Sequence, residues 1–405
     1  MDVKNYALVT AAYWGFTLTD GALRMLVLLH FHRLGFTSVN LAFLFLLYEF
    51  FGVITNLIGG WIGSRFGLKI TLFGGLILQV VALLLLSLTQ DSWTVPYSVA
   101  FVMATQALSG IAKDLTKMSS KSAVKLLVPD DSSANSQSTL FKLVAVLTGS
   151  KNALKGCGFF LGGLLLQSFG FRDSLWMMAA MLAGVLVLML ALLRADMGRS
   201  KAKAKFTELF SKNRAINVLS LARFFLFGAR DVWFVVGLPV FLASQLGWSF
   251  SRVGGFLALW VIGYGAVQAI TPKLIKRGDT IAAGVMAARI WGIALCTITL
   301  VIALALQFDF NVASTVLLGL AVFGAAFAVN SSVHSYLILA YSDSDQVSLN
   351  VGFYYMSNAC GRLIGTLLSG VMYLAYQLPG CMWLSTGMLM CATVLTFWLP
   401  KQNAG

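Results

Sequence analysis

"GGWIGSRFGLK", residues 59–69, connects two long apolar runs and carries the features that decide the fold. Gly60 and Gly67 permit a tight connection and a close approach of the two flanking helices. Arg65 and Lys69 place positive charge in this connection. Because about 20 apolar residues cross a bilayer as a helix, we interpret the stretch as a short basic loop between two transmembrane helices.

The rest of the chain has the same character. It has 405 residues, of which 59% are hydrophobic and 11% charged, so lipid must be its solvent. Backbone groups in lipid must hydrogen-bond internally, so runs of this length are helices. The sequence therefore predicts an all-α membrane protein with twelve transmembrane helices. The predicted spans are 5–33, 40–62, 69–90, 94–115, 139–169, 172–193, 215–245, 252–272, 280–306, 311–340, 347–376 and 379–399.

A long charged connection, 194–214, divides these spans into six and six. We expect an N-terminal six-helix bundle in 1–193, a cytoplasmic linker in 194–214 and a C-terminal six-helix bundle in 215–405. The first span, 5–33, is too long for a cleavable signal peptide.

The two halves also resemble each other. "TDGALRMLVLLHFHRLGFTS" (19–38) parallels "RDVWFVVGLPVFLASQLGWS" (230–249), which pairs Asp20 with Asp231. Weak symmetry between two six-helix halves is typical of transporters with a site at the repeat interface. The alternative is a chance similarity between two apolar helices.

The charge balance orients the chain. Lys plus Arg number 29 against 15 Asp plus Glu. With the N-terminus in the cytoplasm, most loop Lys and Arg fall inside, and only Arg33, Arg172 and Arg252 fall outside. We therefore expect both termini in the cytoplasm and the protein in the inner (plasma) membrane. No RNA- or DNA-binding motif accompanies the charge, so nucleic acid is not an expected partner.

Other chemistry has little support. The five cysteines are odd in number and form no CxxC pair, so we expect neither a disulfide framework nor a metal site. The "SDSD" of 342–345 lacks a catalytic loop around it, and no P-loop is present. We expect no enzymatic activity and no cofactor, apart from possible coupling to protons.

Among the ionisable residues of the predicted spans and their cytoplasmic continuations, we single out ten basic and four acidic residues. Ionisable residues in a membrane are costly and face a bundle interior or water, so they are functional candidates. Arg and Lys together suit phosphate and carboxylate. The candidate anion contacts are Arg24, Lys113, Lys117, Lys151, Lys155, Arg289 and Arg362. For Lys117, Lys142 and Arg223, near cytoplasmic ends, the alternative is that they extend to water.

Asp20, Glu49 and Asp231 have two possible roles: proton-coupling acids, or counter-ions that neutralise nearby arginines. We favour counter-ions. Lysines four residues apart at 113–125 suggest that the helix of span 94–115 continues to Lys125. Such a stripe is either a basic track that guides anions to the cavity or an anchor on lipid headgroups.

Residues 59–69 resemble the loop signature of the major facilitator superfamily, although Ser64 stands where an acid is usual, which puts the usual charge lock in doubt. Four stretches are similar to the ArsJ-type organoarsenical efflux permeases. They are "NYALVTAAYWGFTLTDGALRMLVLLHFHRLGF" (5–36), "LYEFFGVITNLIGGW" (47–61), "AKDLTKMSSKSAVKLL" (112–127) and "GSKNALKGCGFFLGGLL" (149–165).

This resemblance implies export of 1-arseno-3-phosphoglycerate, which a partner glyceraldehyde-3-phosphate dehydrogenase makes from arsenate, and hence arsenate resistance. The basic cavity fits such an anion, whereas the scattered cysteines argue against arsenite. Alternatives are an organophosphate or phosphate antiporter of the same fold, and a non-transporting membrane sensor or scaffold with an added signalling domain. A membrane enzyme is a third alternative.

Overall fold

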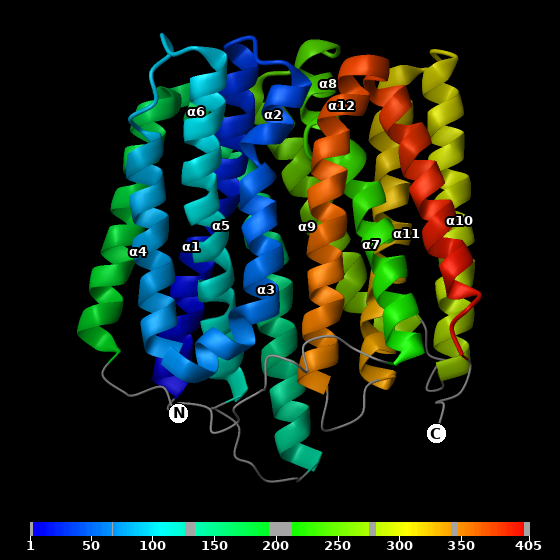
Figure 1. Cartoon of the computed structure of the whole chain (residues 1–405), viewed down its shortest axis with the longest axis horizontal. Coiled ribbons are helices and arrows are strands. Elements are labelled where there is room, and N and C mark those ends of the chain that lie inside the picture. Colours follow the sequence, from blue (N-terminus) through cyan, green and yellow to red (C-terminus); the bar gives the residue numbers. More distant parts are fainter. Residues whose placement is uncertain are drawn as a thin grey trace. The chain divides into compact units, whose positions relative to one another are not determined.

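The computed structural model describes residues 3–66, 68–125, 134–193, 213–274, 281–341 and 347–400, and every regular element within these ranges is a helix (Figure 1). This confirms the predicted all-α class. The helices are α1 (Val3–Arg33), α2 (Ser38–Leu44), α3 (Leu46–Phe66), α4 (Leu68–Leu86), α5 (Val95–Lys125), α6 (Ala134–Leu192), α7 (Arg214–Phe234), α8 (Gly237–Ser244), α9 (Phe250–Leu274), α10 (Ile281–Gln307), α11 (Val312–Ala340) and α12 (Val347–Thr396).

The helix lengths account for the twelve predicted crossings. Within the described ranges, nine helical segments are long and apolar enough to cross a membrane. Two of them have 43 and 45 residues, about twice the length that one crossing needs. They turn at Gly170 in α6 and at Gln377 in α12, where the backbone leaves the helical conformation. Each therefore has the length of two crossings, and α1, which is not among these nine segments, has 31 residues and is long enough for the remaining crossing.

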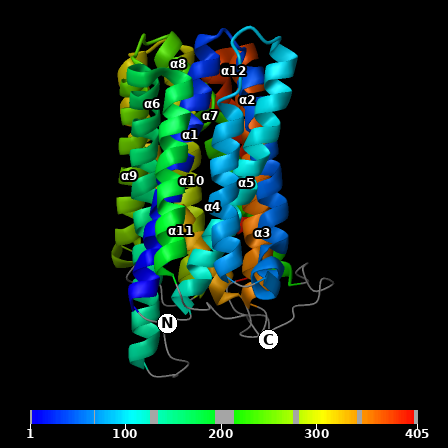
Figure 2. The ribbon, with the colours of Figure 1, turned by 90° about the vertical axis from the view of Figure 1, so that its left-hand side faces the viewer.

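The described helices form two compact units. The first comprises the described residues within 1–34, 54–204 and 249–262. In this unit α1 lies along α6 and α4 along α5 (Figures 1 and 2). Gly158 and Gly162 of α6 allow the close approach, because a Cβ on either would collide with a backbone carbonyl of α1.

The second unit comprises the described residues within 35–53, 205–248 and 263–405. Here α7 lies along α12 (Figure 1). Gly361 and Gly365 of α12 face the backbone of α7 in the same way. The short α2 packs on α12 as well, where the Ser38 hydroxyl donates to the Gly370 carbonyl at 3.0 Å.

The two units repeat one packing pattern, which supports the predicted internal symmetry. Gly158 meets α1 beside Gly21, and Gly365 meets α7 beside Asp231. Gly35 and Gly247, which lie near the ends of the two similar sequences, both adopt a positive φ (84° and 63°) that glycine tolerates. The predicted linker lies outside the described residues up to residue 212, and α7 follows it directly.

Candidate functional site

Helix α7 presents two arginines and an aromatic ring on one face. Arg223, Phe227 and Arg230 follow helical spacing, four and three residues apart, so they lie one above the other. The guanidinium carbons lie 4.0 Å (Arg223) and 4.8 Å (Arg230) from the centroid of the Phe227 ring. The ring thus stands between two cations and attracts both.

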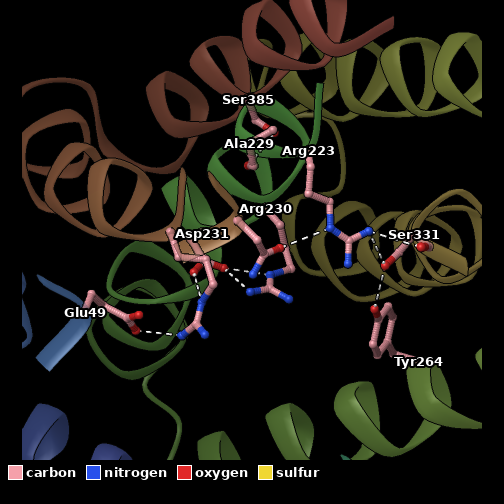
Figure 3. Close-up of polar contacts among 10 residues, drawn as sticks. Glu49, Arg223, Ala229, Arg230, Asp231, Tyr264, Ser331 and Ser385 are labelled. Atoms are coloured by element: carbon pink, nitrogen blue, oxygen red, sulfur yellow. Dashed lines mark hydrogen bonds and ion pairs between the residues drawn. The ribbon is translucent and has the colours of Figure 1, made fainter. Parts of the chain in front are cut away.

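One of these arginines belongs to a buried charge network (Figure 3). Arg230 contacts Oδ1 of Asp231 through Nε at 2.6 Å and Nη2 at 2.5 Å. Arg362 of α12 donates from Nε to Oδ2 of Asp231 at 3.2 Å and from Nη2 to Oε1 of Glu49 at 2.6 Å. Both carboxylate side chains are only 1% exposed. Two arginines and two carboxylates make a neutral group, as buried charges require.

This network brings together three of the predicted site residues: Glu49, Asp231 and Arg362. The arrangement favours the counter-ion interpretation of the two acids, because each carboxylate accepts a charge-assisted hydrogen bond from a guanidinium. Arg230 is among the ten basic residues counted above but not among the predicted site residues. Because it neighbours Asp231 along a helix, its side chain is expected to point in a different direction and to find another partner. Its side chain nevertheless turns back to Asp231.

Arg223 has a different environment, although it lies on the same helix. Its side chain is buried, with 5% exposure, and does not extend to water. Nε donates to Oδ1 of Asn358 at 3.1 Å, and Nη1 donates to the carbonyl and hydroxyl oxygens of Ser331 at 3.1 and 3.0 Å. Sequence reasoning missed this site. Its spacing of seven residues from Arg230 was the available signal.

A second polar cluster lies in the first unit, between α3 and α5. Asp114 is 1% exposed and accepts a hydrogen bond from the Thr55 hydroxyl at 2.6 Å. Lys117 donates to Asn56 Oδ1 at 2.7 Å and lies 3.4 Å from Asp114 Oδ1. The half-buried Lys113 precedes Asp114 on α5. Helix α5 continues to Lys125 as predicted, but the side chains of Lys121 and Lys125 lie outside the described set.

Four more predicted residues lie on the adjoining helices α1 and α6. Asp20 is buried, and Arg24, Lys151 and Lys155 are half-buried. The Lys155 ammonium lies 5.6 Å from the centroid of the Phe159 ring.

Lys155 of the first unit and Arg362 of the second have corresponding positions. Lys155 precedes the helix-contact residue Gly158 by three residues, as Arg362 precedes Gly365. The repeat thus places a cation at the same point of both glycine contacts.

Arg289 of α10 lies at the end of α12. Its Nε and Nη2 donate to the carbonyls of Thr396 and Phe397, both at 3.2 Å. A few residues further along the chain, the Pro400 carbonyl accepts a hydrogen bond from the Tyr341 hydroxyl at 2.6 Å. Burial raises the pKa of Tyr341 to about 12. Arg289 therefore hydrogen-bonds to carbonyls at the C-terminal end of α12, where helix carbonyls lack their usual partners four residues ahead.

Long apolar helices in two compact units, with charged side chains buried between the helices, are typical of membrane transporters. Residues 7–306 match the family model of the Major Facilitator Superfamily, so the chain belongs to this superfamily. No curated protein matches the chain significantly.

Solved structures share the fold. A POT family transporter in complex with a thioalcohol-conjugated peptide is 15% identical, with a TM-score of 0.72 over 97% of this chain and 95% of that one. A POT family transporter in complex with 5-aminolevulinic acid gives the same values. The nucleoside transporter NupG is 14% identical, with a TM-score of 0.73 over 98% of both chains.

Proposed function

We propose that this transporter exports an anionic phosphorylated organoarsenical, 1-arseno-3-phosphoglycerate, from the cytosol by alternating access, and so confers arsenate resistance. A glyceraldehyde-3-phosphate dehydrogenase supplies the substrate. The protein lies in the inner membrane with both termini in the cytoplasm, and the linker at 194–214 joins two six-helix bundles.

The observation that supports an anionic substrate is the excess of basic over acidic side chains inside the spans. Three of the four acids, Glu49, Asp114 and Asp231, already bind cationic side chains. Further basic residues lie on the same helices. An enclosed positive surplus is costly in a membrane, and an anion offsets this cost when it binds.

Among the predicted contacts, we assign anion binding to the basic residues on helices α1, α5 and α6. These are Arg24, Lys113, Lys117, Lys151 and Lys155. Lysine suits this role because its ammonium is a mobile point charge. Arg362 remains a candidate, because an arriving anion can compete with Glu49 for its guanidinium. Arg289 is assigned to the end of α12 instead, since two of its three nitrogens already donate to backbone carbonyls there.

If Glu49 and Asp231 are counter-ions, the energy for export must come from a source other than proton coupling through these acids. A membrane potential that is negative inside drives anions outward by about 2.3 kcal/mol per charge per 100 mV. A multiply charged phosphorylated arsenical therefore leaves down its electrical gradient. Export then requires no acid that couples transport to protons. This agrees with the counter-ion role of Glu49 and Asp231, which neutralise arginines.

The arsenical itself comes from the sequence resemblance and is tested in arsenate-sensitive cells. The cells express the transporter alone, the dehydrogenase alone, or both, and cellular arsenic is measured. We expect resistance and low accumulation only with the pair. The matched control replaces wild type by the double variant Lys151→Gln, Lys155→Gln at equal membrane abundance.

Two other results would change the proposal. Resistance from the transporter alone would point to a broader anion exporter. Exchange of glycerol phosphates without arsenic, together with no resistance from the pair, would favour an organophosphate antiporter.

A further inference from the structure

We propose that Arg223, together with Tyr264, Ser331 and Asn358, forms a subsite that binds one acidic group of the transported anion. The inference rests on the proposed function in that it takes the ligand to be this anion. The subsite is made by α7, α9, α11 and α12 of the second unit and is separate from the neutral network around Asp231.

Arg223 lacks a counter-ion within the part of the chain that the structure describes. Arg230, Arg362 and Lys117 each form an ion pair with a carboxylate, and Arg223 forms none. Its acceptors are the neutral oxygens of Asn358 and Ser331. Because arginine stays charged and a buried charge without a partner is costly, the site favours a ligand that brings negative charge.

The guanidinium also keeps hydrogen-bonding capacity. Nε is used by Asn358 and Nη1 by Ser331, whereas Nη2 donates to no residue of the described ranges. The rings of Phe227 and Tyr354 lie 4.0 and 5.1 Å from the guanidinium carbon. Aromatic stacking fixes the plane of the guanidinium and leaves its edge for a ligand, the geometry in which arginine binds oxoanions.

Neighbouring groups add donors at the same place. The Tyr264 hydroxyl lies 3.4 Å from Ser331 Oγ (Figure 3) and accepts a hydrogen bond from Gln268 Nε2 at 2.7 Å. Since this bond occupies an acceptor site of the hydroxyl, its hydrogen points away toward Ser331. A phosphate, arsenate or carboxylate oxygen that replaces Ser331 Oγ as the acceptor of this hydrogen would bind a guanidinium and a phenol together.

A second observation indicates that a polar ligand group belongs here. His334, one helical turn beyond Ser331 on α11, is 1% exposed, and its two ring nitrogens have no hydrogen-bond partner among the described residues. Buried polar atoms normally have partners, and an orphaned pair calls for a ligand or water. A bound oxoanion would supply an acceptor for Arg223 and for the one N–H group of a neutral His334.

The two arginines of α7 thus have different tasks. On one side of Phe227, Arg230 is neutralised by Asp231. On the other side, Arg223 contributes one unmatched positive charge. The ligand class is an oxoanion, either the phosphate or the arsenate ester of the substrate or a carboxylate.

The test measures binding to the purified full-length protein in detergent by titration calorimetry. The probes are 3-phosphoglycerate and inorganic phosphate, with glycerol as the neutral probe. Arg223→Gln removes the charge, whereas Asn358→Asp keeps the shape and supplies an internal carboxylate next to Nε. Arg214→Gln removes the same charge from an exposed position at the start of α7 and is the matched control.

We expect both subsite variants to bind the two anions at least about 10-fold more weakly. Arg223→Gln loses a charged hydrogen bond to the ligand, and in Asn358→Asp the new carboxylate neutralises Arg223. The control should bind as wild type. Asn358→Asp should also unfold at a higher temperature, so it tests the subsite even if Arg223→Gln does not fold. Unchanged affinity in Asn358→Asp, with wild type binding anions, would overturn the subsite alone. If wild type binds neither anion, the proposed function falls together with the subsite.

Discussion

Replacing Arg362 by glutamine should lower the free energy of unfolding by about 3–4 kcal/mol at pH 7. The substitution removes a guanidinium that donates to Glu49 at 2.6 Å in a site where that carboxylate is 1% exposed. Breaking a buried ion pair costs about 3–5 kcal/mol. A proton can replace the lost cation, and protonating a carboxyl with a reference pKa of about 4.3 costs about 3.7 kcal/mol at pH 7, which sets the upper limit.

The partner substitution should cost less. In Glu49→Gln, Arg362 keeps its contact with Asp231 at 3.2 Å, so we expect a loss of about 1–2 kcal/mol. The double variant leaves Arg230 paired with Asp231, a neutral remnant. Its loss should therefore be smaller than the sum of the single losses by about 2 kcal/mol. The exposed Arg214→Gln should change stability by no more than about 0.5 kcal/mol.

The assay is titration of the purified protein with SDS, followed by tryptophan fluorescence, at pH 7 and pH 5.5. Since protonation becomes easier by about 1.4 kcal/mol per pH unit, the loss in Arg362→Gln should shrink by about 2 kcal/mol at the lower pH. Additive losses that do not depend on pH would refute the idea that Glu49 and Arg362 neutralise each other.

Three further predictions concern other contacts of the helices. The double variant Lys151→Gln, Lys155→Gln should reach the membrane folded but show no anion transport in proteoliposomes; unchanged transport would reject these lysines as anion contacts. Gly370→Ala should destabilise the protein by about 1–3 kcal/mol, because the added methyl would overlap the backbone of α2, whereas Gly387→Ala on the same helix has open space and should be neutral. Arg289→Gln should lower stability by about 1–2 kcal/mol through two lost hydrogen bonds while anion binding in calorimetry stays within 2-fold, and a larger loss of binding would return Arg289 to the substrate site.

The sequence predicts the helices well because lipid leaves few alternatives. Apolar length alone defines a membrane helix, and each predicted span has its counterpart in the structure. The points at which a predicted span is interrupted are less predictable. Phe45 separates α2 from α3 inside one predicted span, and no glycine or proline marks that point.

The sequence shows which charged residues are candidates for a functional site, but it does not show which of them form ion pairs with each other. Rarity in a membrane singles out Glu49, Asp231 and Arg362, yet Glu49 lies more than 300 positions from Arg362 in the sequence, and only the fold brings them together. For Arg223, the position along the helix gave the wrong prediction of its environment. A cation near a helix end was interpreted as reaching water, whereas Ser331 and Asn358 hold it inside the second unit.

The internal repeat shows which features this chain keeps and which it varies. The glycine contacts recur at Gly158 and Gly365, because helices that approach this closely exclude any side chain. The cation three residues earlier also recurs, but as Lys155 in the first unit and Arg362 in the second. Arginine has a planar fork that binds two carboxylates at once, and here it does so. Lysine cannot bind in this way and moves more freely. The same backbone position thus holds a fixed charge network in the second unit and suits the mobile anion contact that we propose for the first, and the proposed subsite at Arg223 would give the second unit its own place for an anion.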